Sequence, residues 1–218
     1  MALPLDRPAT GSRTYGGRKG RMSPTRQRAL DELVPRYAVV GPVASAGRLI
    51  VEIGCGKGDA TAAMAPADAA ADAAVIACEA NQATIANLAR LLDAAGITNV
   101  ALWVGDAFDL LAQLGPSRVD ELRIWFPDPW PKPRHAGKRL VTPNRVAVLT
   151  DALVTGGRLR LATDASAYAD QALSVLSAEP RLAGEVVARP AARPITPFEA
   201  RGLRAGHAAI DLEFRRIA

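Results

Sequence analysis

Short apolar runs alternate with segments of helical periodicity along most of the chain, which is the pattern of an α/β domain. The clearest helix follows Asn81, a typical N-cap, and carries apolar residues at helical spacing to about residue 95. Other helices are expected from Ser23-Pro24, over 59–64, from Thr142-Pro143 to about 153, and over 165–178. Seven segments are expected to be strands: 49–53, 75–79, 100–104, 122–126, 158–163, 184–188 and 208–217. This alternation predicts a mostly parallel central sheet with helices on both faces.

Two connecting segments are expected to lack regular structure. Residues 66–74 are rich in alanine and aspartate and are expected to form a variable surface connection. Residues 195–202 are expected to form a polar loop that carries one aromatic side chain, Phe198.

The composition fits one globular domain in a reducing compartment. The chain has 218 residues, of which 49% are hydrophobic and 22% charged, enough to bury a substantial core. Its longest apolar stretches are interrupted by aspartate and no signal-peptide pattern opens it, so no membrane segment is expected. Cys55 and Cys78 form no C-x-x-C motif, which favours a cytoplasmic setting. His135 and His207 are too few and scattered for a metal site, so no metal is expected.

The first 28 residues form a basic arm in front of a single domain over 29–218. Seven Lys and Arg stand in the arm against one acid, Asp6, a balance of +6 in a chain whose net charge is +5. One interpretation is a disordered, solubilising terminus. The other is a strap that binds the phosphates of a polyanionic partner. Both remain open on the sequence.

A glycine-rich turn follows the first expected strand, in the segment Glu52-Ile53-Gly54-Cys55-Gly56-Lys57-Gly58. Alternate glycines let the backbone turn tightly and let a ligand lie against it. The spacing is G-x-G-x-G, whereas dinucleotide sites use G-x-G-x-x-G. Glu52 would repel phosphate but suits a cationic amino-acid head group. Together these features favour a nucleoside ligand without a pyrophosphate, although the turn alone is a weak signal.

Acidic residues close three successive expected strands. Glu79 ends the second strand, 25 residues after Gly54, where an acid accepts hydrogen bonds from the two hydroxyls of a ribose. Asp106 ends the third strand, and Glu52 stands near the end of the first. Any one of these acids would more often be a helix cap or a surface residue. Three of them beside a glycine turn favour a cofactor site.

A proline-rich loop follows the fourth expected strand and holds Asp128 between Pro127 and Pro129. Proline fixes its own φ and disfavours helix in the residue before it, so the loop is stiff. Trp130 comes next, and would either stack on a base or pack the loop. A cationic run then follows: Lys132, Arg134, Lys138 and Arg139. A rigid acid at the end of a strand fits a reactive centre, and the alternative is an ordinary turn after an edge strand.

Several spaced motifs resemble known families. The segment 52–58 resembles the first motif of class I methyltransferases that use S-adenosylmethionine. The segment Phe126-Pro127-Asp128-Pro129-Trp130-Pro131-Lys132, followed by Arg134-His135, is similar to the signature of bacterial tRNA (guanine-N7-)-methyltransferases, the TrmB family. The C-terminal Thr196-Pro197-Phe198-Glu199 and the pair Thr163-Asp164 also resemble motifs of that family. Pro133, Ala136, Gly137 and Pro197 stand where the family more often has Lys or His.

The resemblance implies a Rossmann-like class I methyltransferase fold whose last strand is antiparallel. It implies S-adenosylmethionine as the cofactor, S-adenosylhomocysteine as its product, and N7 of guanine 46 in the variable loop of tRNA as the target. The expected cofactor-binding residues are Glu52, Gly54, Gly56, Glu79, Asp106 and Asp128, and Asp128 is also the expected catalytic residue. The expected substrate-binding residues are Lys132, Asp164, Thr196, Pro197, Phe198 and Glu199. No protein partner is implied, and monomer and homodimer both remain open.

The chemistry of guanine N7 agrees with such a site, because N7 carries a lone pair and no proton in the neutral base. Methyl transfer to it needs alignment more than a general base. Two rivals stay open. A short Asp-Pro-aromatic loop also suits methylation of an exocyclic amine, and a non-catalytic RNA-binding protein could keep the same scaffold. An NAD-dependent enzyme is disfavoured by the glycine spacing.

Overall fold

The computed structural model describes residues 22–39 and 47–218. Its strands are β1 (Arg48–Ile53), β2 (Ala73–Glu79), β3 (Val100–Val104), β4 (Val119–Trp125), β5 (Leu153–Thr163), β6 (Leu182–Val187) and β7 (Ile210–Arg216). Its helices are α1 (Pro24–Glu32), α3 (Asp59–Ala70), α4 (Gln82–Ala95), α5 (Ala107–Leu114), α6 (Pro143–Ala152), α7 (Ser166–Ser177) and α8 (Pro197–Arg204). Two 3₁₀ turns, η1 (Val34–Tyr37) and η2 (Pro133–Lys138), complete the described elements.

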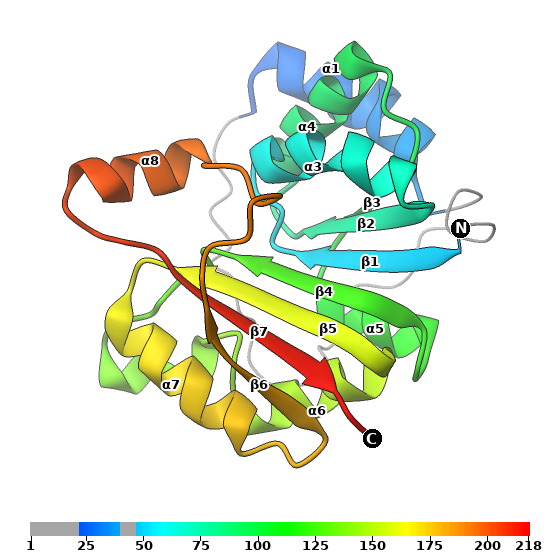
Figure 1. Cartoon of the computed structure of the whole chain (residues 1–218). Helices are drawn as coiled ribbons and strands as arrows, with labels where there is room; N and C mark the ends of the chain where they lie inside the picture. The colour runs from blue at the N-terminus through cyan, green and yellow to red at the C-terminus, as the bar shows by residue number, and fades with distance from the viewer. Residues whose placement is uncertain (1–21, 40–46) are drawn as a thin grey trace.

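All seven strands join one sheet in the order β3-β2-β1-β4-β5-β7-β6. The pairs from β3 to β5 are parallel, and β7 is antiparallel to both of its neighbours. The chain builds the sheet outward from β1 to β3 and then crosses to β4 on the other side of β1 (Figure 1). The predicted mostly parallel sheet with an antiparallel last strand is confirmed, and the crossover is where open α/β sheets bind ligands.

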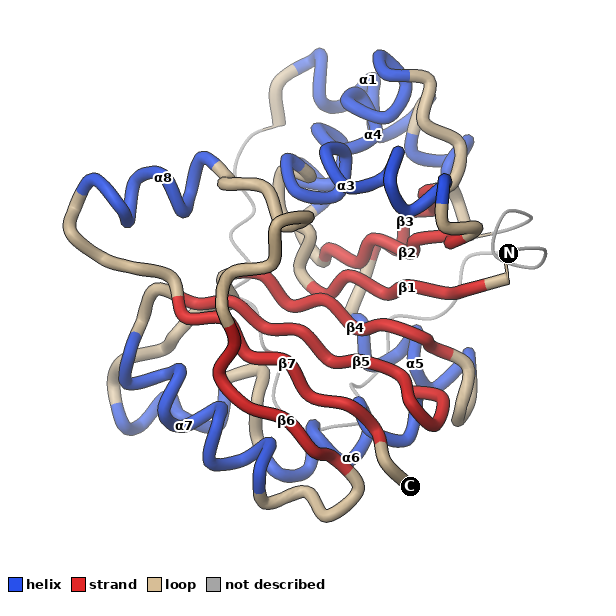
Figure 2. The backbone as a smooth tube through the Cα atoms, viewed as in Figure 1, coloured by secondary structure: helices blue, strands red, loops and turns tan. Residues whose placement is uncertain are grey.

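The sheet is buried on both faces near its centre. Along β1, Leu49, Val51 and Ile53 pack into a core formed with α5, α6 and α7. Ile50 faces the opposite way, into a core formed with α4. Successive side chains of a strand point to opposite faces, so a strand buried on both sides reads as one continuous apolar run. Figure 2 shows the two layers of helices on either side of the strands.

Tertiary contacts changed two of the expected connections. The helix expected over 59–64 continues as α3 to Ala70, with Pro66 inside it. Asp68, in the part added by this extension, is bound by Arg123 of β4. The loop expected over 195–202 contains helix α8, which begins at Pro197 with Thr196 as its N-cap. The eight-residue helix α5 was not expected at all.

The N-terminal arm expected over 1–28 lies mostly outside the described residues. Its last residues, from Pro24, belong to α1, and Ser23 caps this helix by accepting a hydrogen bond from the amide of Arg26 at 3.4 Å. None of the described helices is long and apolar enough to cross a membrane.

Candidate functional site

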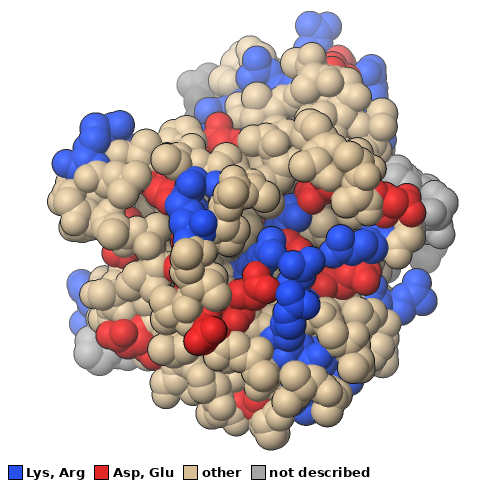
Figure 3. Space-filling model, in the orientation of Figure 1, with Lys and Arg blue, Asp and Glu red and all other residues tan. Residues whose placement is uncertain are grey.

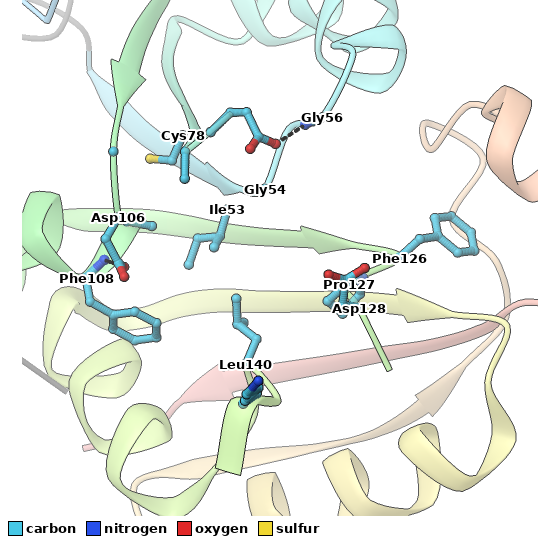
Figure 4. A pocket seen from close by; sticks show the side chains of 15 residues that line it. Ile53, Gly54, Gly56, Cys78, Asp106, Phe108, Phe126, Pro127, Asp128 and Leu140 are labelled. Atoms are coloured by element: carbon cyan, nitrogen blue, oxygen red, sulfur yellow. Dashed lines mark hydrogen bonds between the residues drawn. The ribbon is translucent and has the colours of Figure 1, made fainter. Parts of the chain in front are cut away.

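A pocket of about 290 Å³ lies at the carboxyl ends of β1 to β4. Each of these four strands contributes to its wall, through the segments that follow β1, β2, β3 and β4 (Figure 4). Of the predicted cofactor residues, the wall includes Gly54, Gly56, Glu79, Asp106 and Asp128. The fold therefore brings together residues that lie up to 74 positions apart in the sequence.

The glycine turn after β1 has the conformation that its composition predicts. Gly54, Gly56 and Gly58 have φ values of 74°, 57° and 84°, in the left-handed region that favours glycine. A Cβ on Gly58 would also lie 2.4 Å from Cδ1 of Leu88, so the turn packs directly on α4. The amides of Gly54 and Cys55 donate to the carbonyl of Cys78 at 2.9 and 3.0 Å. These contacts hold the turn beside the end of β2.

Glu79 is fixed by two backbone amides. Its Oε2 accepts a hydrogen bond from Gly56 at 3.1 Å, and its Oε1 accepts one from Asn81 at 2.7 Å. Burial raises the pKa of its carboxyl, and the nearby Asp128 raises it further, while the amide hydrogen bonds act in the opposite direction. A carboxylate held in this way is rigid before any ligand arrives.

Asp106 lines the pocket and also caps a helix. Its Oδ1 accepts a hydrogen bond from the amide of Phe108 at 3.0 Å at the start of α5. Phe108 belongs to the same wall. The two interpretations of this acid, helix cap and site residue, are thus compatible in the structure.

Glu52 is separate from the other two acids. It is 1% exposed and is not among the residues that line the pocket. Along β1 it shares the face of Ile50, on the side of the sheet covered by α3 and α4. Burial raises the pKa of its carboxyl to about 7, against the opposing effects of the nearby Thr61 and Arg123. Its Oε2 has no hydrogen-bond partner within the described part of the chain.

The loop after β4 is strained on both sides of Asp128. Phe126 and Trp130 have φ values of 50° and 41°, unusual for residues with side chains. The amide of Phe126 still donates to Ala162 at 2.7 Å, so the turn starts directly at the sheet edge. Phe126, Pro127 and Asp128 line the pocket, and Asp128 is exposed there. Strain of this kind persists where the surrounding structure imposes it, and often marks a functional site.

An aromatic pair stands at the rim of this pocket. The rings of Phe126 and Phe198 have centroids 5.6 Å apart, and Phe198 is 49% exposed. The guanidinium of Arg201 lies over the ring of Phe198, 5.6 Å from its centroid. Asp164 reaches α8 as well, since a Cβ on Gly202 would be 2.9 Å from its Oδ2. Two of the predicted substrate residues therefore lie at or on α8: Phe198 belongs to the helix and packs on Phe126, and Asp164 reaches the helix at Gly202.

Two further members of the C-terminal motif, Thr196 and Pro197, lie at the start of the same helix. The Oγ1 of Thr196 accepts a hydrogen bond from the amide of Glu199 at 3.1 Å, and Pro197 occupies the exposed first turn. The proline suits this position because its missing N–H would have no partner there.

Glu199 faces the interior and not the open rim. It is 3% exposed and accepts hydrogen bonds from Arg193 at 2.7 and 3.0 Å. Arg193 is 1% exposed, and it also donates to both oxygens of Asp211 on β7, each at 2.8 Å. Its guanidinium lies 5.4 Å from the ring centroid of Phe126. Arg193 is not predicted from the sequence, because its partners Glu199 and Asp211 form no recognisable pattern with it along the chain.

The cationic run after Asp128 is divided by the fold. Lys132 is exposed and lies outside the pocket wall, whereas Lys138 belongs to the wall. The Nζ of Lys138 lies 4.9 Å from the ring centroid of Trp130, and His135 meets that ring edge-on at 5.6 Å. These contacts favour packing of the loop, and not stacking on a base, as the role of Trp130.

Several basic residues elsewhere are paired with acids. Figure 3 shows Lys and Arg interleaved with Asp and Glu over the face where β4, β5 and β7 lie. Arg160 there pairs with Glu213 at 2.9 Å and with Glu121 at 3.5 Å. Over residues 22–39 and 47–218, no group of three His, Cys, Asp or Glu side chains could hold a metal ion.

Comparisons with known proteins agree with this geometry. The model of a family described as "Putative methyltransferase" matches residues 46–212. The chain is 41% identical over 222 residues to a tRNA (guanine-N(7)-)-methyltransferase of Burkholderia vietnamiensis, covering 94% of this chain and 85% of that protein. It is also 41% identical over 216 residues to a protein of the same name from Nocardioides sp., covering 93% and 86%.

Solved structures resemble the fold at low sequence identity. An rRNA methylase from Streptococcus thermophilus matches with a TM-score of 0.54 and 14% identity, over 91% of this chain and 100% of that one. TrmN from Thermus thermophilus matches with a TM-score of 0.54 and 17% identity, over 88% of this chain and 48% of that one. These likenesses support the methyltransferase fold.

The raised pKa of Glu52 predicts a specific pH dependence of stability. The folded protein holds a proton on Glu52 up to about pH 7, whereas the unfolded chain releases it near 4.5. The contribution of Glu52 to stability is therefore complete below about pH 4.5 and is lost as the pH rises to about 7. Relative to Glu52→Gln, the wild-type free energy of unfolding should fall by up to about 3 kcal/mol over that range. Urea unfolding of both proteins at several pH values measures this, and parallel curves would refute it.

The buried position of Glu199 predicts that its loss weakens the fold. Glu199→Gln leaves Arg193 with one carboxylate partner in a buried site, and should lower the free energy of unfolding by roughly 3 kcal/mol. Glu185→Gln on β6 is the matched control, because Glu185 is exposed and its loss should cost less than about 0.5 kcal/mol. Chemical denaturation compares the two variants, and equal stabilities would show that the buried pair contributes little.

Proposed function

The chain belongs to the tRNA (guanine-N(7)-)-methyltransferases, and from this we propose that it transfers a methyl group from S-adenosylmethionine to N7 of a guanine in tRNA. Guanine 46 of the variable loop is the proposed target. The observation that carries the proposal is the placement of Asp128: a strained, proline-framed loop holds it on the wall of a pocket that also contains the glycine turn and Glu79.

The residues of the pocket fit this cofactor. Glu79 presents a fixed carboxylate to a ribose diol, and the glycine turn leaves room for a backbone-close ligand without offering a phosphate site. Ile53, Phe108 and Leu140 supply apolar wall for a purine ring. Asp106 would complete the set of acids.

Methyl transfer to N7 chiefly requires the protein to align the methyl donor with the guanine. S-adenosylmethionine supplies an electrophilic methyl group on a sulfonium, and the lone pair of guanine N7 forms the new bond as the carbon–sulfur bond breaks. No proton leaves N7, so no residue needs to act as a base there. Asp128 would accept hydrogen bonds from the N1–H and amino group of guanine. Its charge would also stabilise the positive purine that forms.

The rim offers a place for the target base and its RNA. Phe198 and Phe126 would stack on the base, a contact that typically contributes about 1–3 kcal/mol. Thr196 and Pro197 would border it from the start of α8, and Asp164 from the segment after β5. Lys132 would bind a phosphate from the solvent side. Glu199 would act indirectly, by holding α8 in position through its hydrogen bonds with Arg193. Figure 3 shows cationic side chains over α8, which carries Arg201 and Arg204.

Incubation with labelled S-adenosylmethionine and unmodified tRNA tests the proposal. We expect 7-methylguanosine in the nucleoside digest, and RNA that is cleaved by aniline after reduction. Methylation of an exocyclic amine would appear as a different nucleoside without cleavage. Absence of any transfer, together with absence of cofactor binding, would point to an RNA-binding protein on the same scaffold. A tRNA with guanine 46 replaced tests the position.

Asp128→Asn should lower the single-turnover rate by roughly 100-fold at saturating tRNA and cofactor. The amide removes the charge and places a donor against the guanine N1–H. Affinity for tRNA should change little, because it is spread over many phosphates. Asp170→Asn on the exposed side of α7 is the matched control. A near-normal rate in folded Asp128→Asn would exclude Asp128 from the reaction.

A further inference from the structure

The guanidinium of Arg139 points back into the loop that carries Asp128. Its Nε donates to the carbonyl of Pro129 at 3.0 Å, and its Nη2 donates to the carbonyl of Trp130 at 3.4 Å. On another side it lies 5.7 Å from the ring centroid of Tyr168. Arg139 belongs by sequence to the cationic run after Asp128, yet its donors serve the protein's own backbone.

We propose that Arg139 is a positioning residue that fixes the loop around Asp128, and that it does not bind tRNA phosphate. This inference rests on the proposed function, because it concerns how Asp128 is held for methyl transfer. Its two acceptors, Pro129 and Trp130, are the two residues that directly follow Asp128 in the chain.

The composition of the loop explains why such a clamp is required. Pro127, Pro129 and Pro131 have no amide N–H, so they cannot donate to a neighbouring strand. The carbonyls of the loop still require donors, and the positive φ of Trp130 removes the segment from regular pairing. The planar fork of an arginine meets two successive carbonyls at once. A lysine ammonium has no such fixed geometry.

The backbone of Arg139 is itself held by a second arginine. Arg145, which is 2% exposed, donates to the carbonyl of Arg139 and to that of Gly137, the latter at 3.0 Å. The guanidinium of Arg145 lies 5.9 Å from the ring centroid of Phe108 on the pocket wall. A continuous set of contacts thus joins the wall formed after β3 to the loop that carries Asp128.

The next residues of the chain are held as firmly. The amide of Val141 donates to the hydroxyl of Tyr168 at 3.3 Å, and Gln171 donates to the carbonyl of Val141 at 2.8 Å. Both partners belong to α7, so the base of the clamp is tied to a helix packed on the sheet. A rigid base is what a positioning residue requires.

The test separates a clamp from a phosphate contact. Arg139→Lys keeps the positive charge and loses the fork, so its single-turnover rate at saturating tRNA should fall by about tenfold to 100-fold. Cofactor affinity and the salt dependence of tRNA binding should stay as in the wild type. Lys132→Gln, an exposed cation of the same loop, is the contrasting variant. It should flatten the slope of log affinity against log salt by about 0.7–0.9.

Hydrogen exchange of the free protein supplies a readout that is independent of RNA. Amides of residues 128–139 should exchange faster in Arg139→Lys than in the wild type, and at the wild-type rate in Lys132→Gln. A normal saturated rate and normal exchange in Arg139→Lys, with a flatter salt slope in Arg139→Gln, would overturn the proposal. If the wild type methylates no tRNA, the proposed function fails, whereas the exchange comparison still decides whether Arg139 clamps the loop.

Discussion

Parallel pairing of β1 to β4 is the constraint on which the rest of the site depends. Parallel strands in register end at the same edge of a sheet, so the segments that follow them must meet there. The pairs Ile53–Cys78 and Glu79–Val104 fix that register at the ends of β1, β2 and β3. The glycine turn, the two lining acids and the proline loop then share one pocket although their chain positions are far apart. The crossing of the chain from β3 to β4 leaves this edge open for a ligand.

Arginine side chains, most of them buried, join segments that strand pairing does not hold together. Arg193 joins α8 to β7 through two carboxylates, and Arg139 joins the proline loop to its own base. Arg123 joins α3 to β4 by donating to both oxygens of Asp68 at 2.7 Å. A guanidinium carries five donors in a rigid plane, so one side chain satisfies acceptors from two elements at once. Its burial is tolerated because each of these charges is paired or hydrogen-bonded.

Much of the site was predicted from the sequence because its chemistry is local. Alternate glycines imply positive φ at Gly54 and Gly56, and the structure has it at both positions. Prolines imply a stiff frame for Asp128, and the structure places Asp128 on the pocket wall. The prediction was weaker where a residue's role depends on distant partners. Glu199 belongs to a motif associated with substrate, yet it is enclosed by Arg193. The sequence of α8 is short and polar, so it predicts a loop. In the structure the segment is a helix, held in place by contacts such as that ion pair.

Taken alone, the sequence determined the fold class, the order of the strands along the chain, the position of the acids at strand ends and the family of the chain. These follow from periodicity, from turn chemistry and from motifs that are contiguous in the chain. The tertiary structure decided which acids reach the pocket and which cations face inward. Glu52 lies off the pocket wall, and Arg139 turns to the carbonyls of its own loop. The direction and burial of a side chain depend on elements packed against it from elsewhere in the chain, and local sequence carries no record of those partners.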